Sequence, residues 1–154
     1  MSADSSLSVE ARHATNPSLT LKRWLNAPPA RVYAAWTDPE KLMGWFGPHG
    51  ATMLDAQIDA RVGGRFHAVF RTSDGEEHSV SGVYREVIPN QKLIFTWAWR
   101  STPERQSLVT IVLGDEGDAT LLTLLHEQFF DESARDRHMV GWVGTLDRLE
   151  AFFP

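Results

Sequence analysis

The sequence predicts an α+β domain in which a long C-terminal helix lies across a curved antiparallel sheet of six to seven strands. Three observations lead to this prediction: an amphipathic stretch at residues 133–153, a run of strand-like segments after Gly50, and the lack of room for helices between them. Strands and helices that are grouped along the chain favour an antiparallel sheet over a doubly wound fold. We expect the functional site to lie in the space between the long helix and the sheet.

The first ordered elements are expected to be a strand and two short helices. Residues 1–17 are polar and are predicted to form a disordered tail, and residues 18–154 a single domain. Residues 19–25 alternate as a strand does, and the Asn-Ala-Pro-Pro stretch that follows can begin a helix. Helices are predicted at residues 30–37 and 40–44. The segment Trp-Phe-Gly-Pro at 45–48 is too apolar for an exposed loop, so it should tuck inward.

The middle of the chain is predicted to be a series of strands separated by turn signals such as Gly63-Gly64 and Pro89-Asn90. The predicted strands are residues 53–60, 65–71, 77–87, 92–100, 108–113 and 119–128. In the strand 92–100, one face is apolar by alternation. Its members are Leu93, Phe95, Trp97 and Trp99.

The C-terminal stretch has an apolar face at steps of three and four residues, which predicts a helix. This face consists of Met139, Trp142, Val143, Leu146, Leu149 and Phe153. Ser133 followed by Asp136 has the spacing of a capping box. Gly141 and Gly144 lie inside the helix and each costs about 1 kcal/mol relative to Ala. They either permit close packing against the sheet or make room for a ligand.

Composition limits the function. With a net charge of −5 and an isoelectric point of about 5.6, the chain lacks the basic face that nucleic acid or an anionic membrane requires. It has no cysteine, which excludes disulfides, thiol nucleophiles and cysteine-bound zinc, and we expect a cytoplasmic protein. No apolar run reaches the length of a membrane span. The histidines have no metal-binding spacing, so neither a metal nor another cofactor is expected.

Six stretches of sequence, in the same order as the predicted elements, carry a resemblance to a known family. They are residues 31–42, 45–48, 59–66, 82–97, 120–126 and 141–149. Together they resemble the helix-grip (START-like, SRPBCC) superfamily. Within it, the chain is most similar to the family of the activator of the heat-shock-90 chaperone ATPase, in its small single-domain bacterial form. The resemblance implies a sheet wrapped around the C-terminal helix, with a cavity that often takes apolar small molecules.

The candidate ligand-binding residues are mostly aromatic, as an apolar pocket requires. They are Trp45, Phe46, Phe66, Phe95, Trp97, Trp99, His126, Met139, Trp142, Val143 and Leu146. Core packing could explain any one of the aromatic residues, because each ring buries about 150–250 Å². His126 could bond a ligand or move a proton near neutral pH, or it could be a strand-end histidine satisfied by backbone or water.

A charged cluster surrounds the Gly63-Gly64 turn. It consists of Asp59, Arg61 and Arg65. One interpretation is a polar anchor at the mouth of the cavity that recognises a carboxylate or hydroxyl group of the ligand. The other is a pair that stabilises the hairpin.

Three functional hypotheses follow. The first is a binding module for a small apolar or amphipathic molecule. The second, implied by the resemblance, is a regulator that acts on a chaperone in the stress response. The third is a polyketide cyclase-like enzyme that would use His126 with Asp59 in the same cavity, and an enzyme is the less favoured class. Either a monomer or a homodimer paired through strand edges is compatible with the sequence.

Overall fold

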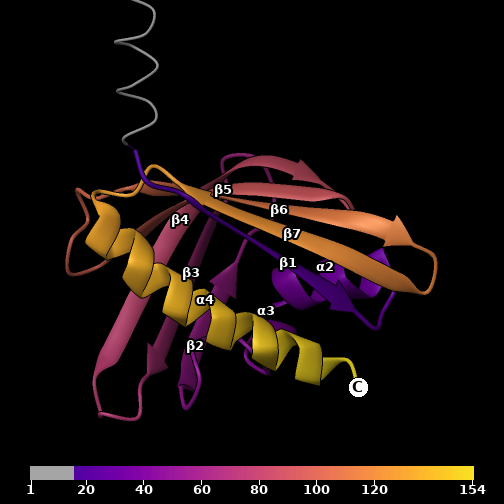
Figure 1. Cartoon of the computed structure of the whole chain (residues 1–154), viewed down its shortest axis with the longest axis horizontal. Coiled ribbons are helices and arrows are strands. Elements are labelled where there is room, and N and C mark those ends of the chain that lie inside the picture. Colours follow the sequence, from indigo (N-terminus) through magenta and orange to yellow (C-terminus); the bar gives the residue numbers. More distant parts are fainter. Residues whose placement is uncertain (1–15) are drawn as a thin grey trace, which may run out of the picture.

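The structure is a computed structural model that describes residues 16–154, so all but the last two residues of the predicted tail lie outside the described range. Seven strands and three helices are present in this range (Figure 1). The strands are β1 (Leu19–Leu25), β2 (Thr52–Ile58), β3 (Arg65–Arg71), β4 (Glu77–Ile88), β5 (Lys92–Trp99), β6 (Ser107–Glu116) and β7 (Ala119–Glu127). The helices are α2 (Pro29–Thr37), α3 (Pro39–Leu42) and α4 (Glu132–Phe152).

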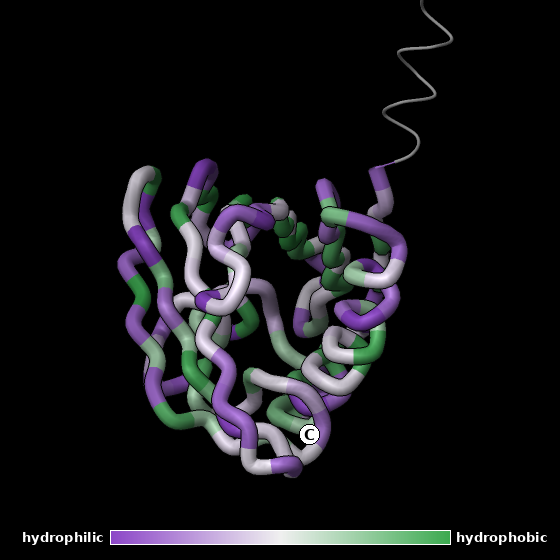
Figure 2. The backbone as a smooth tube through the Cα atoms, turned by 90° about the vertical axis from the view of Figure 1, so that its left-hand side faces the viewer, coloured by the Kyte–Doolittle hydropathy of each residue, from purple (hydrophilic) through white to green (hydrophobic). Residues whose placement is uncertain are grey.

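All seven strands form one antiparallel sheet in the order β1-β7-β6-β5-β4-β3-β2. The last strand, β7, therefore pairs with the first, β1, which forms one edge of the sheet. The chain passes from β1 through α2 and α3 to β2 at the opposite edge. Register shifts between Met53 and Asp55 and between Tyr84 and Glu86 bend the sheet. Seen from the side, the strands curl into a trough (Figure 2), and α4 runs diagonally across it (Figure 1). The predicted fold class is confirmed.

The concave face of the sheet carries the core. Leu93, Phe95 and Trp97 alternate along β5 and are all buried, which confirms the predicted face. The segment after α3 is also buried as predicted: Trp45 is completely inaccessible, and its indole N–H donates to the Ala35 carbonyl at 3.1 Å. None of the helices in the described part of the chain combines the length and the apolar character that a membrane span requires.

Several predicted boundaries were wrong: the strand predicted at residues 53–60 ends at Ile58, the helix predicted at 40–44 ends at Leu42, and the start of α4 and the end of β6 also differ. Helix α4 is capped by Asp131, whose carboxylate accepts from the backbone N–H of Ala134 at 2.8 Å, and not by Ser133. The Ser133 hydroxyl instead accepts a bond from Arg137 at 2.7 Å. Strand β6 continues through Gly114 to Glu116, because the turn is made further on at Gly117, where φ is +77°. In both places two residues could serve, and the pairing of the neighbouring strands decides between them.

Candidate functional site

A pocket of about 240 Å³ lies between α4 and the strands β3 to β5, partly open to solvent. Its walls come from the end of β3, from β4 and β5, from the loop after α3, and from one face of α4. The lining residues are Phe46, Gly47, Pro48, Phe70, Thr72, His78, Trp97, Trp99, Arg137, His138, Gly141, Trp142 and Thr145. Five of the lining residues are phenylalanine or tryptophan, and we therefore treat this pocket as the candidate site.

Five aromatic rings form the apolar wall of the pocket. Trp97 and Trp99 share a face of β5 because they are two residues apart, and their ring centroids are 5.5 Å apart at an interplanar angle of 88°. Trp142 of α4 lies 5.1 Å from Trp97. Phe46 and Phe70 complete the wall at about the same spacing, 6.3 Å from Trp97 and 6.0 Å from Trp99 respectively. These spacings are those of edge-to-face and tilted aromatic pairs, so the wall is preformed.

The two glycines of α4 have different roles. A Cβ atom added at Gly144 would lie 2.8 Å from the backbone nitrogen of His49, so this glycine permits close packing of the loop against the helix. A Cβ atom added at Gly141 would have nothing within 4 Å, and Gly141 lines the pocket. Close packing therefore accounts for Gly144, whereas Gly141 borders open space.

His138 organises two of the indole groups. The Nε1–H groups of Trp97 and Trp99 both donate to its Nε2 atom, at 3.3 and 2.9 Å. Because Nε2 accepts, Nδ1 carries the proton, and it donates to the Ala134 carbonyl at 2.7 Å. Burial lowers the pKa of His138, and the neighbouring Arg137 acts in the same direction, against the bond to Ala134. His138 is thus a neutral acceptor with both ring nitrogens occupied.

His126 holds the third indole from behind the pocket. Its Nδ1 atom accepts from the indole N–H of Trp142 at 2.9 Å, so Nε2 is protonated and donates to the hydroxyl of Ser107 at 2.7 Å. Burial, followed by the nearby His138, lowers the pKa of His126 to about 2. The side chain is completely buried and does not line the pocket. It is satisfied by two side chains, rather than by backbone or water, and it stays neutral at physiological pH.

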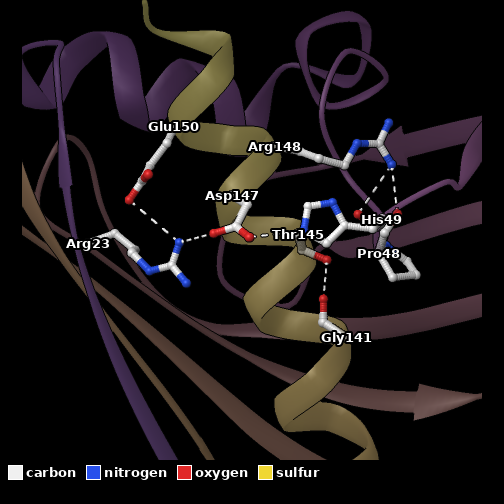
Figure 3. A network of polar contacts seen from close by, with 9 residues as sticks. Arg23, Pro48, His49, Gly141, Thr145, Asp147, Arg148 and Glu150 are labelled. Carbon is white, nitrogen blue, oxygen red and sulfur yellow. Dashed lines mark hydrogen bonds and ion pairs between the residues drawn. The ribbon is translucent and has the colours of Figure 1, made fainter.

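The loop after α3 is fastened to α4 by polar contacts (Figure 3). The Arg148 side chain donates to the carbonyls of Gly47 and Pro48, at 3.3 and 3.1 Å, and both of these residues line the pocket. One residue earlier on the helix, Asp147 contacts His49 at 2.9 Å and accepts from Arg23 of β1 at 2.6 Å. Arg23, and then His49, lowers the pKa of Asp147. One wall of the pocket is therefore held in place by the helix that forms the opposite wall.

The structure places the predicted ligand-binding residues in two groups. Phe46, Trp97, Trp99 and Trp142 line the pocket. The other predicted residues lie outside the lining. Those buried in the core behind the pocket are Trp45, Phe66, Phe95, His126 and Leu146. Those half-buried on α4 are Met139 and Val143.

The charged cluster at the turn after β2 lies outside the lining of this pocket. Asp59 and Arg61 form an exposed ion pair at 2.9 Å, and Arg65 is exposed at the start of β3. None of the three lines the pocket. Within residues 16–154, Asp59 forms no hydrogen bond with His126, its proposed partner in catalysis, because the His126 ring is bonded to Ser107 and Trp142. The contact between Asp59 and Arg61 is the one expected of a pair that stabilises a hairpin.

The polar groups at the pocket come from residues that sequence reasoning passed over. These are Thr72, His78, Arg137, His138 and Thr145. The helix positions 137, 138, 141, 142 and 145 are connected by steps of three and four residues, namely 137–141, 138–141, 138–142, 141–145 and 142–145, and this spacing was the available signal. It was missed because the face combines a charge, a histidine, a glycine and a threonine rather than apolar side chains.

Comparison with known proteins agrees with this geometry. A model of a protein family described as "Activator of Hsp90 ATPase homolog 1-like protein" matches residues 26–153. The chain belongs to this family. No curated protein matches the chain.

Solved structures of similar proteins share the fold. The structure of protein CV1439 from Chromobacterium violaceum superposes with a TM-score of 0.80 at 29% identity, and the match covers 88% of this chain and 96% of that one. An AHSA1 protein from Silicibacter pomeroyi matches with a TM-score of 0.78, 29% identity and the same coverage of both chains. CalU16 from Micromonospora echinospora matches at 0.66 and 28% identity, over 90% of this chain and 76% of that one. The helix-grip fold and the resemblance read from the sequence are confirmed.

Proposed function

We propose that this protein binds a small apolar or amphipathic molecule in the pocket between α4 and the sheet. The observation that carries the proposal is the open space at Gly141, which faces a wall of five aromatic rings. Ligand sites are concave, mostly apolar and largely preformed, with a few placed polar groups, and this pocket has all of these properties.

The energetics of the helix support a site rather than a packing defect. A glycine inside a helix costs about 1 kcal/mol relative to alanine. At Gly144 the close approach of His49 accounts for that cost, but at Gly141 no neighbouring atom does. Positions that break a local rule without a packing reason are expected at functional sites.

The polar groups of the pocket favour binding over catalysis. Both ring nitrogens of His138 are engaged, and the hydroxyl of Thr145 donates to the Gly141 carbonyl at 2.8 Å. The hydroxyl of Thr72 is shared between Asp74, at 2.5 Å, and His78, at 3.1 Å. A general base needs an accessible nitrogen or oxygen within reach of the substrate, and the buried, neutral His126 does not offer one. Of the two histidines that line the pocket, His138 has both ring nitrogens engaged, and the Nε2 atom of His78 contacts the hydroxyl of Thr72.

The proposal is tested by filling the pocket. We would measure the binding of 2-naphthalenemethanol, a neutral two-ring compound, by isothermal titration calorimetry. Gly141→Leu places a side chain in the open space and should weaken binding at least tenfold. Val140→Leu is the matched control, because Val140 is the neighbouring residue of α4 and is 75% exposed. Unchanged affinity in Gly141→Leu, or no binding by the wild-type protein, would refute the proposal.

A second candidate is regulation of the Hsp90 ATPase, which the family description favours. Such regulation would act through the surface of the protein. The ATPase rate of Hsp90 should then change when this protein is added, and Gly141→Leu should leave the change intact. A change that depends on Gly141 would connect regulation to the pocket instead, and an unaltered ATPase rate would remove this candidate.

A further inference from the structure

We propose that the ligand has an aromatic body of one or two rings and a carboxylate, which Arg137 binds at the rim of the pocket. This inference rests on the proposed function, since it names the chemical class of molecule that the same pocket would take. It is carried by the size of the pocket, by the hydrogen bonds already made in its wall, and by its charge.

The size of the pocket limits the apolar body. An engineered cavity of roughly 150 Å³ in another protein is filled by benzene. The volume here, about 240 Å³, is roughly one and a half times as large, which suits two fused rings better than a sterol or a long acyl chain. A flat ring can also make edge-to-face contacts with Trp97, Trp142 and Phe46, whose own rings are tilted relative to one another.

The wall offers the ligand almost no hydrogen-bond donor. The indole N–H groups of Trp97 and Trp99 are bound to His138, and that of Trp142 is bound to His126. The remaining proton of the His138 ring and the hydroxyl of Thr145 are donated to backbone carbonyls of α4. Each tryptophan therefore presents only its ring to the pocket, and any polar group of the ligand must be recognised elsewhere.

Arg137 is the group that can recognise it. Among the lining residues it alone carries a permanent charge, and none of the others is a carboxylate. One of its nitrogens donates to the Ser133 hydroxyl at 2.7 Å, and no carboxylate of residues 16–154 lies within ion-pair distance of it. This holds although the adjoining groove, which Arg137 also lines, contains Glu76 and Glu77. Arg137 is exposed and lines the pocket, and the planar fork of N–H donors of an arginine matches the two oxygens of a carboxylate.

The preference for an anion is measured by comparing two ligands of one shape. We would titrate the protein at neutral pH with 2-naphthoate and with 2-naphthalenemethanol. An ion pair at an exposed rim contributes up to about 1 kcal/mol, so 2-naphthoate should bind up to about fivefold more tightly. In Arg137→Gln this preference should disappear, and in wild-type protein it should decrease as salt is added. Arg100→Gln is the matched control: Arg100 is exposed and lines the adjoining groove but not the pocket.

The outcomes separate this inference from the proposed function. A preference that Arg137→Gln removes and Arg100→Gln retains supports the assignment. Equal binding of the two compounds by the wild-type protein, or a preference that survives in Arg137→Gln, overturns the carboxylate and leaves an apolar binding pocket. If neither compound binds, the proposed function fails and this inference fails with it. Thermal unfolding of both variants verifies that they fold, which we expect because Arg137 is exposed.

Discussion

Replacing the two glycines of α4 by alanine should change stability in opposite directions. At Gly141 a methyl group would meet nothing within 4 Å, so only the helix propensity changes. Alanine is favoured over glycine by about 1 kcal/mol inside a helix, partly because the unfolded chain becomes less flexible. Gly141→Ala should therefore raise the free energy of unfolding by up to about 1 kcal/mol.

The same substitution at Gly144 should be destabilising. The added methyl group would lie 2.8 Å from the backbone nitrogen of His49 and 3.0 Å from its ring, and the backbone atom cannot move aside as a flexible side chain could. Forcing an extra carbon into such a packed site costs typically about 1–3 kcal/mol. After the gain in helix propensity of about 1 kcal/mol is subtracted, we expect a net loss of up to about 2 kcal/mol.

The two variants are best compared directly by urea denaturation and by thermal unfolding. Their free energies of unfolding should differ by about 1–3 kcal/mol, the packing cost at Gly144, which for a domain of this size corresponds to roughly 2–12 °C in Tm. If Gly141→Ala is as destabilising as Gly144→Ala, then the space beside Gly141 is not open and the pocket is smaller than described. If Gly144→Ala is stabilising, then the loop at His49 does not press on the helix.

Two further predictions concern the groups around the pocket. Burial lowers the pKa of His126 from 6.5 to about 2. Below about pH 6.5 the unfolded chain therefore binds a proton that the folded chain does not. The contribution of His126 to the free energy of unfolding is complete above about pH 6.5 and falls by about 1.4 kcal/mol per pH unit below it. Urea denaturation should therefore give a free energy of unfolding about 2 kcal/mol lower near pH 5 than near pH 7, and equal values would contradict a neutral, buried imidazole. Arg148→Met removes two hydrogen bonds to the carbonyls of Gly47 and Pro48 and should lower the free energy of unfolding by about 1–3 kcal/mol, measured by urea denaturation. Arg85 is exposed, so Arg85→Met is the control and should change this free energy by less than about 0.5 kcal/mol. A similar loss in both variants would show that these bonds do not hold the loop.

The fold could be predicted from the sequence because its signals are local and repeated. The strands Leu19–Leu25 and Arg65–Arg71 end where they were predicted to end, since alternation and the flanking proline or glycine residues agree there. The start of α4 was misplaced because Asp131 and Ser133 are both good capping residues. Which of them caps the helix depends on where β7 releases the chain, and that is fixed by pairing between distant strands.

The site was harder to predict because chemically equivalent residues have different surroundings. Trp45 and Trp142 look alike in the sequence, but the first is enclosed by α2 and the second faces the pocket. Arg137 lies off the apolar face of the helix, where a charged residue is expected to be merely solvated. Whether it also borders a pocket depends on how far the sheet curves around α4, and the periodicity of the helix carries no information about that curvature.

The hydrogen bonds among the tryptophans determine what kind of selectivity the pocket can have. An indole lining a binding site usually offers its N–H to the ligand, because a buried donor without a partner is costly. Here the indole N–H groups of Trp97 and Trp99 donate to His138, and that of Trp142 donates to His126. Each histidine can accept these hydrogen bonds only while its ring is neutral. The two lowered histidine pKa values are therefore a condition for an apolar wall and not a sign of acid–base catalysis. Under the proposed function, the shape of the rings inside the pocket and the charge at the rim would then select the ligand.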